Sequence, residues 1–174
     1  VAKRSSYMLI VGSENTVEGL DTTFLVGEGN FMKDTTSAVV FGKDHDISGN
    51  TNFTFVTGQG HKQFEGDYNV LLGRDNESRN SQSSFMTGIN NKDFNGLGTI
   101  VAGQDQVLTN VKYTLVTGKD TTISTVETSI TGGNENTISN SKNLLISGFK
   151  NNIDNVETSN INGMNNIIKD ASNS

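Results

Sequence analysis

A glycine recurs along the chain at a nearly constant spacing. The repeat glycines are Gly12, Gly27, Gly42, Gly58, Gly73, Gly88, Gly103, Gly118, Gly133, Gly148 and Gly163. The period between neighbouring repeat glycines is fifteen positions, and only the step from Gly42 to Gly58 is longer, by one. A fixed period of this kind is the signature of a repeat protein, in which each unit packs on its neighbours. The period therefore predicts a single repeat domain over residues 1–174, with about eleven coils.

The two positions that precede each repeat glycine by two and by three residues are apolar in nearly every copy. Val40 and Val101 are examples of the first position, and Val39 and Ile100 are examples of the second. Adjacent residues of a strand point to opposite faces, so this pattern predicts a strand that is buried on both faces. A coil as short as this one is too thin to cover both. We therefore expect another copy of the protein, or a further part of the chain, to cover the second face.

A second, shorter strand is predicted after each glycine. The third residue after the glycine is Asn in most copies, and it is His45, His61, Gln106 or Thr121 in the others. The fifth residue after it is usually apolar, which indicates a half-buried strand. Gly suits a sharp corner, Asn tolerates positive φ, and stacked Asn amides can form hydrogen bonds from coil to coil. Because the unit is too short for a helical repeat, we predict an all-β parallel β-solenoid, a rod of roughly 50 Å at about 4.8 Å per coil.

Composition and charge exclude several classes of protein. The chain has no Cys, which rules out a disulfide scaffold, a thiol nucleophile and a Cys-ligated zinc site. Its net charge is −6 and its 13 Lys and Arg residues are scattered, which argues against a nucleic-acid partner. It contains no run of about 18 apolar residues, so we expect no direct membrane insertion by these residues. We also expect the chain to be a fragment of a longer protein.

Several phrases of the repeat resemble those of a known family. The segments LIVGSENTV, VVFGKDHDI, LVTGKDTTI and LLISGFKNNI are similar to the head repeats of trimeric autotransporter adhesins, the YadA-like head. The resemblance in period and pattern covers almost the whole chain. It implies a left-handed parallel β-roll whose apolar strands pack together in a homotrimer.

The resemblance also implies a function. Members of this family are non-enzymatic adhesins on the outer surface of Gram-negative bacteria, anchored in the outer membrane. Their heads bind extracellular-matrix proteins or host receptors, including immunoglobulin receptors of the CEACAM type. We therefore expect a cell-surface localisation, a host-protein partner, no enzymatic activity and no cofactor. Two alternatives remain open, namely a structural and receptor-binding module of a phage tail fibre or spike and, less favoured, an ice-binding solenoid.

One irregular region of the repeat is a candidate for ligand binding. The fifth position after the glycine is polar in three consecutive coils, where Gln63, Ser78 and Asp93 stand, and Phe64 and Phe94 follow directly. A slip of one residue would turn these rings outward, so we predict an aromatic-bearing band over residues 50–97. The alternative is sequence drift, with both rings buried by a small bulge. The candidate ligand-binding residues are Phe53, His61, Phe64, Tyr68, Arg74, Arg79 and Phe94.

Catalytic and metal sites are not expected. His45 and His61 fall in the Asn column of successive coils and could stack, but a metal site needs further ligands and the pattern supplies none. We expect both residues to replace Asn as hydrogen-bonding turn residues. A polysaccharide-cleaving β-helix would need two or three acidic residues clustered with a base, and we expect no such cluster here.

Overall fold

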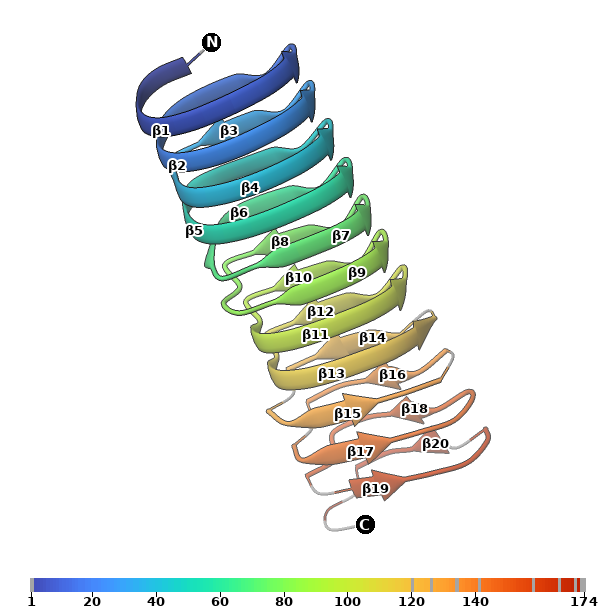
Figure 1. Cartoon of the computed structure of the whole chain (residues 1–174). Coiled ribbons are helices and arrows are strands. Elements are labelled where there is room, and N and C mark those ends of the chain that lie inside the picture. The colour runs from blue at the N-terminus through green and yellow to red at the C-terminus, as the bar shows by residue number, and fades with distance from the viewer. Residues whose placement is uncertain are drawn as a thin grey trace.

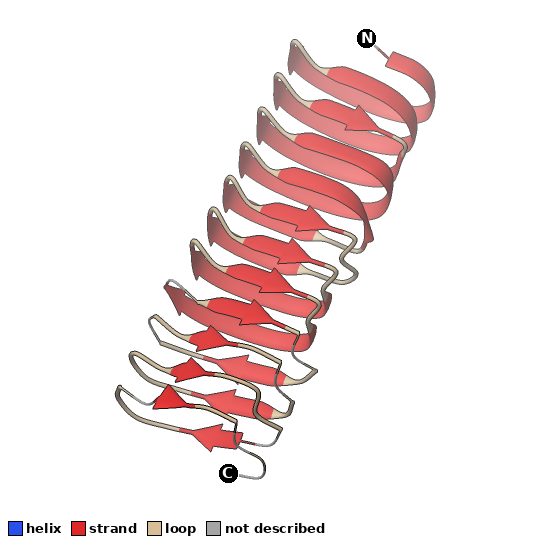
Figure 2. Cartoon of the chain, turned by 180° about the vertical axis from the view of Figure 1, so that it is seen from behind, coloured by secondary structure: helices blue, strands red, loops and turns tan. Residues whose placement is uncertain are grey.

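The computed structural model describes residues 2–119, 121–125, 127–133, 135–140, 142–157, 159–165, 167–170 and 172. These residues form an all-β parallel solenoid in which one turn follows another along a rod, with the N- and C-termini at its two ends (Figure 1). The strands form a 20-stranded sheet, and the view from behind shows strands and loops (Figure 2). The described residues contain no helix long and apolar enough to span a membrane.

Two walls of strands run along the rod. The first, which we call the glycine wall, consists of the strands that lead to or contain the repeat glycines. They are β1 (Ala2–Ser13), β2 (Thr16–Glu28), β4 (Thr35–Lys43), β5 (Asp46–Gln59), β7 (Val70–Arg74), β9 (Phe85–Ile89), β11 (Leu97–Gln104), β13 (Lys112–Lys119), β15 (Ser129–Thr131), β17 (Leu144–Ile146) and β19 (Ser159–Ile161). The second is the short-strand wall. It contains β3 (Phe31–Lys33), β6 (Lys62–Asp67), β8 (Glu77–Arg79), β10 (Lys92–Phe94), β12 (Val107–Thr109), β14 (Thr122–Ser124), β16 (Thr137–Ile138), β18 (Asn152–Ile153) and β20 (Ile167–Ile168). The first residues of β2 and β5 also belong to this wall, because they pair with β3 and β6 before the strands continue into the glycine wall.

Strand pairing follows the period of the sequence. Phe24 pairs with Val39 between β2 and β4, and Leu115 pairs with Ile100 between β13 and β11, in each case one period apart. The single longer step is absorbed at one place, because the register between β5 and β6 shifts between Ser48 and Thr51. The remaining register is unchanged, so the same positions of every coil share one face.

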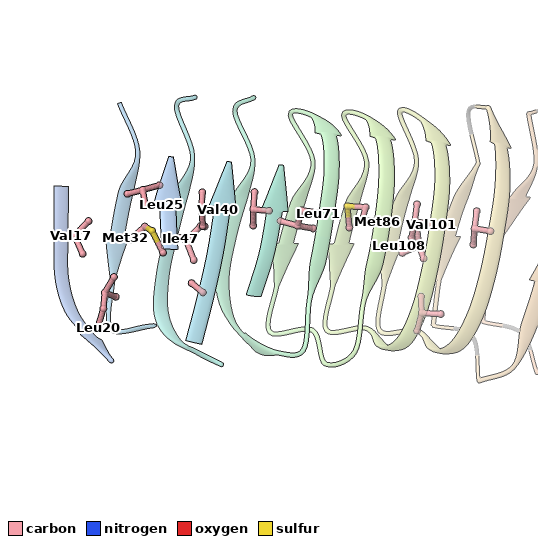
Figure 3. Packing of buried hydrophobic residues seen from close by; sticks show 14 of the residues in the cluster. Val17, Leu20, Leu25, Met32, Val40, Ile47, Leu71, Met86, Val101 and Leu108 are labelled. Atoms are coloured by element: carbon pink, nitrogen blue, oxygen red, sulfur yellow. The ribbon is translucent and has the colours of Figure 1, made fainter. Parts of the chain in front are cut away.

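The apolar core is a narrow double row inside the rod. From Leu25 to Val116 the residues two before the repeat glycine point inward from the glycine wall, and from Val17 to Leu108 the residues five after it point inward from the short-strand wall (Figure 3). Leu71 and Met86 represent the first row, Ile47 and Leu108 represent the second, and all four side chains are fully buried. Burying a side chain of this size contributes about 1.5–3 kcal/mol.

A ladder of polar side chains lines one interior corner. Asn76 Nδ2 donates to the carbonyl oxygens of Leu72 (2.8 Å) and Gly88 (3.1 Å), and its Oδ1 accepts from the backbone N–H of Asn91 (2.9 Å). The prediction that the Asn side chains form hydrogen bonds from coil to coil is thereby confirmed. In this coil their partners are backbone groups. The expectation that these Asn residues themselves take positive φ is wrong. In this coil the non-glycine residues with positive φ are Asp75, Asn80 and Ser83.

The repeat glycines are required by close packing as well as by conformation. A Cβ atom at Gly88 would overlap the carbonyl oxygen of Gly103 in the next coil, and the φ of Gly88 is +118°. The same overlap recurs from Gly12 to Gly148. The repeat glycines from Gly12 to Gly118 lie within strands, and Gly133, Gly148 and Gly163 lie two residues after one, whereas sequence reasoning placed all of them at sharp corners. The close approach of coils, rather than a turn alone, explains the fixed period.

Within the chain the glycine wall is buried on one face only. Val101 is fully buried, whereas its neighbour Ile100 is 46% exposed. One chain therefore leaves the outer face uncovered, as expected for so thin a coil. That another copy, or a further part of the chain, covers this face stays a prediction.

Candidate functional site

The outer face of the glycine wall carries a largely apolar stripe that ends in polar residues, Asn160 and Asn162, in the last coil. It is formed by the residues that precede each repeat glycine by three and by one. Neither position holds a charged residue in any copy. The rings of Phe24 and Phe41 lie 5.4 Å apart, and those of Phe41 and Phe55 lie 6.4 Å apart, so the stripe is packed along its length. Its exposed large side chains are Leu9, Val11, Phe41, Phe55, Phe85, Ile100, Leu115, Ile130 and Leu145.

Charged residues border this stripe just after the repeat glycine. Lys43 Nζ lies 3.7 Å from Glu28 Oε2, and Arg74 Nε lies 3.5 Å from Asp75 Oδ2. All four side chains are about half exposed, so each pair contributes little stability. The candidate residue Arg74 therefore lies at the rim of the stripe.

Two other candidate residues form a stacked pair at the corner that precedes the glycine wall. The rings of Phe53 and Tyr68 lie 5.0 Å apart at 5° and are 54% and 59% exposed. Beside them, Asn52 Nδ2 donates to Asp67 Oδ1 (2.7 Å). Both aromatic residues have positive φ, 51° and 57°, which is a strained conformation for a bulky side chain. The same corner also has positive φ at Ser37 and Ser83, so this conformation belongs to the repeat, and the exposed, stacked rings are what mark the pair as a candidate site.

Sequence reasoning missed Tyr113, which occupies the same corner. Tyr113 is 57% exposed and has a φ of 55°. It follows Tyr68 by three periods, so the regular spacing of the repeat could have identified it.

Three further candidates line up on the outer face of the short-strand wall. Phe64, Arg79 and Phe94 are register partners in β6, β8 and β10. The Arg79 guanidinium lies 5.9 Å from the centre of the Phe94 ring and also pairs with Glu77. Phe64 and Arg79 line a shallow hollow together with Asp46, Ser48, Lys62 and Gln63. The predicted band thus divides into two surfaces, this row and the corner of Phe53 and Tyr68.

The predicted slip of one residue does not occur. Gln63 and Asp93 occupy the interior position that apolar residues hold in other coils, and both are buried. Phe64 is 47% exposed because the next residue of a strand points outward. The alternative, burial of this ring by a bulge, is therefore also wrong. The bulge between Ser48 and Thr51 restores the register so that polar side chains enter the core.

The candidate residue His61 is inside the rod and has no access to an outer surface. Its ring stacks on that of His45, with centroids 5.1 Å apart. Nδ1 of His45 accepts from the His61 backbone N–H, and Nδ1 of His61 accepts from that of Asn76, both at 3.1 Å. The two residues replace Asn in the ladder, as predicted. The described residues hold no group of three His, Cys, Asp or Glu side chains that could bind a metal ion.

Burial governs the protonation of the two histidines. Desolvation, together with the neighbouring His61, lowers the pKa of His45 from 6.5 to about 4. Desolvation also lowers the pKa of His61. The neutral ring is the form that leaves Nδ1 free to accept, so the ladder and the lowered pKa values agree.

Comparisons with known proteins yield no relative. No family model matches the chain, and neither the curated proteins nor the solved structures include a match.

Proposed function

We propose that the chain is the head of a trimeric bacterial surface adhesin, a left-handed β-roll of about eleven coils that binds a host receptor or matrix protein without catalysis. The observation that carries the proposal is the uncharged apolar stripe on the glycine wall. Soluble monomers rarely expose apolar patches larger than a few hundred Å². Three copies that pack their glycine walls together would remove the stripe from water along the whole rod.

Solution mass tests the assembly. Light scattering after size-exclusion chromatography should give the mass of three 18.7 kDa chains. Phe85→Glu places a charge in the stripe and should yield monomers, because each copy would bury an unpaired carboxylate. Phe64→Glu is the matched control, since Phe64 and Phe85 are exposed to similar extents but lie on different walls. A monomeric wild-type protein, or equal behaviour of the two variants, would contradict the proposed packing.

The two aromatic surfaces are the proposed receptor contacts, since exposed aromatic and Arg side chains carry most of the binding energy at protein interfaces. The assembled protein should bind animal cells or immobilised matrix proteins. Phe53→Ala with Tyr68→Ala, or Phe64→Ala with Arg79→Ala, should weaken that binding about tenfold or more. Tyr113→Ala is the control for the first pair, since it alters the same corner three coils away. Unchanged affinity of both double variants would exclude these surfaces.

A phage tail-fibre module is the second candidate, because a stiff trimeric rod would suit it equally well. The two functions differ in the cell that is recognised. Binding of the labelled rod to bacterial cells, with none to animal cells or matrix proteins, would favour the tail fibre. An ice-binding function needs a regular row of Thr, whereas the position before the glycine holds Thr only at Thr57, Thr87 and Thr117 and varied residues in the other coils.

A further inference from the structure

Asp93 is a carboxylic acid in the middle of the core. It lies in β10 at the interior position five residues after Gly88, and its side chain is fully buried. The corresponding residue in the next coil is Leu108. A buried carboxylate without a countercharge is among the most costly groups in a protein interior. The surroundings of Asp93 therefore decide which protonation state the fold can hold.

One carboxyl oxygen of Asp93 and two hydroxyl oxygens form a closed triangle. Ser84 Oγ and Thr99 Oγ1 each lie 2.6 Å from Asp93 Oδ2, and they lie 2.6 Å from each other. Each of these three contacts is a hydrogen-bond distance and needs one proton. The two hydroxyl groups supply only two protons. A proton on Oδ2 supplies the third, so that each oxygen donates once and accepts once around the ring.

The rest of the environment also disfavours the charged form. Asp93 Oδ1 has no hydrogen-bond partner among the described residues. The interior positions that pack against it are uncharged and belong to Ser78 of β8, Leu108 of β12, Ser84 before β9 and Thr99 of β11. The charged residues of β8 and β10 are Glu77, Arg79 and Lys92, which alternate with the inward positions and face outward. Burial raises the pKa of Asp93, although hydrogen bonds from Ser84, Thr99 and Ser81 oppose the rise.

We propose that Asp93 is a buried proton-binding site, which keeps its proton well above the pH at which an exposed aspartic acid ionises, and that loss of the proton loosens the coils around it. Ionisation would leave two protons for three short contacts and a charge facing apolar side chains. Coils of a solenoid contact only their neighbours. The loosening should therefore be confined to the coils next to β10.

The dependence on pH follows from linkage. In the unfolded chain the carboxyl group ionises near its ordinary pKa of 3.8, whereas in the folded chain that pKa is raised. Between these two values the folded state binds one more proton than the unfolded state. Stability contributed by Asp93 is thus full below 3.8 and is lost as the pH rises to the folded pKa, with a tenfold change in the unfolding constant per pH unit.

Infrared difference spectroscopy of the intact protein tests the site directly. In the wild type the carbonyl stretch of a protonated carboxylic acid should persist at pH values where the exposed carboxyl groups are ionised, and it should be absent in Asp93→Asn. The side-chain amide of this variant can donate to both hydroxyl oxygens, which preserves the three contacts in a residue that does not titrate. Asp154→Asn, at an exposed position, is the matched control and should retain the band.

Hydrogen exchange supplies the second readout. Amides of β8, β10 and β12 should lose protection in the wild type as the pH rises through the folded pKa, whereas Asp93→Asn should keep it. Titration of the Asp93 carboxyl at or below pH 3.8 in the wild type would overturn the proposal, whether or not the variant folds. The same conclusion would follow if the folded variant showed the wild-type dependence of exchange on pH.

Discussion

In most described coils the residue three places after the repeat glycine forms hydrogen bonds through both ends of its side chain, although Gln106 Oε1 and Thr121 Oγ1 have no partner among the described residues. One end accepts a backbone N–H from the next coil, and the other donates to carbonyl oxygens on either side, as Asn91 does to Thr87 and Gly103. An amide has an acceptor and a donor group in this geometry, and so does a neutral imidazole with its proton on Nε2. This equivalence explains why His45 and His61 can stand in an Asn column. The replacement of Asn by His could be predicted from this column of the repeat, whereas the burial of His61 could not.

The histidine pair should make the rod sensitive to acid. Because the pKa of His45 is about 4 in the folded chain and 6.5 in the unfolded chain, stability is full above pH 6.5 and is lost as the pH falls towards 4. The loss should be on the order of 2–3 kcal/mol. Urea denaturation at several pH values should measure it. The variant His45→Asn with His61→Asn should lack this pH dependence yet remain folded, and an equal acid sensitivity in that variant would contradict the assignment.

At the scale of the element, the strands of the glycine wall are held at a spacing that only glycine permits. A side chain at these positions would meet the backbone of the next coil, which cannot move without disturbing the ladder beside it. The two faces of the same strands differ completely, since Met86 is fully buried and Phe85 is 40% exposed. The alternation of side chains could be predicted from the sequence. Whether a second layer covers the outer face depends on the assembly and not on the strand.

Two glycine variants separate steric overlap from backbone strain. Gly88→Ala should be strongly destabilising, by about 4 kcal/mol or more, because it adds an overlap with the Gly103 carbonyl to the strain of φ +118°. Gly163 has a similar φ, +104°, but no atom of the described residues lies within 4 Å of a Cβ added there. Gly163→Ala should cost only about 1–2 kcal/mol. Thermal denaturation of both variants checks this, and equal losses would show that strain alone requires the glycines.

At the scale of the whole molecule, the rod is a linear array in which the interior positions recur once in every period. Hydrogen bonds and core contacts connect each coil to the coils before and after it, so no part of the rod depends on a distant one. Asp93 and the histidine pair are consequently local features of an otherwise uniform core.

Removal of one full period should therefore be tolerated. Deletion of residues 104–118 joins Gly103 to Lys119, which occupies the position of Gln104, and keeps every later residue at its interior or exterior position. Deletion of residues 104–111 instead breaks the register of the repeat and places Tyr113 next to the interior Asn column. Circular dichroism should show a folded, cooperatively melting rod for the first variant only. Failure of the first deletion to fold would mean that contacts beyond nearest neighbours stabilise the rod.

The sequence by itself determined the fold class, because the features that define it act within one coil and its neighbour. The period of the glycines, the apolar pairs such as Val39 and Val40, and the Asn column identified a parallel β-solenoid, because each constrains its own coil and the next one. The same period brought Tyr68 and Tyr113 to one corner.

Only the tertiary structure decided which side chains are inside. Gln63 and Asp93 look like surface residues in the sequence and lie in the core, while Phe64 looks apolar and lies outside. The physical reason is that strand register is set by the backbone hydrogen bonds of the entire stack. A polar residue in one coil takes an interior position because its backbone pairs in register with the adjacent coils. Hydroxyl groups from other strands then form hydrogen bonds with it, as Ser84 and Thr99 do with Asp93.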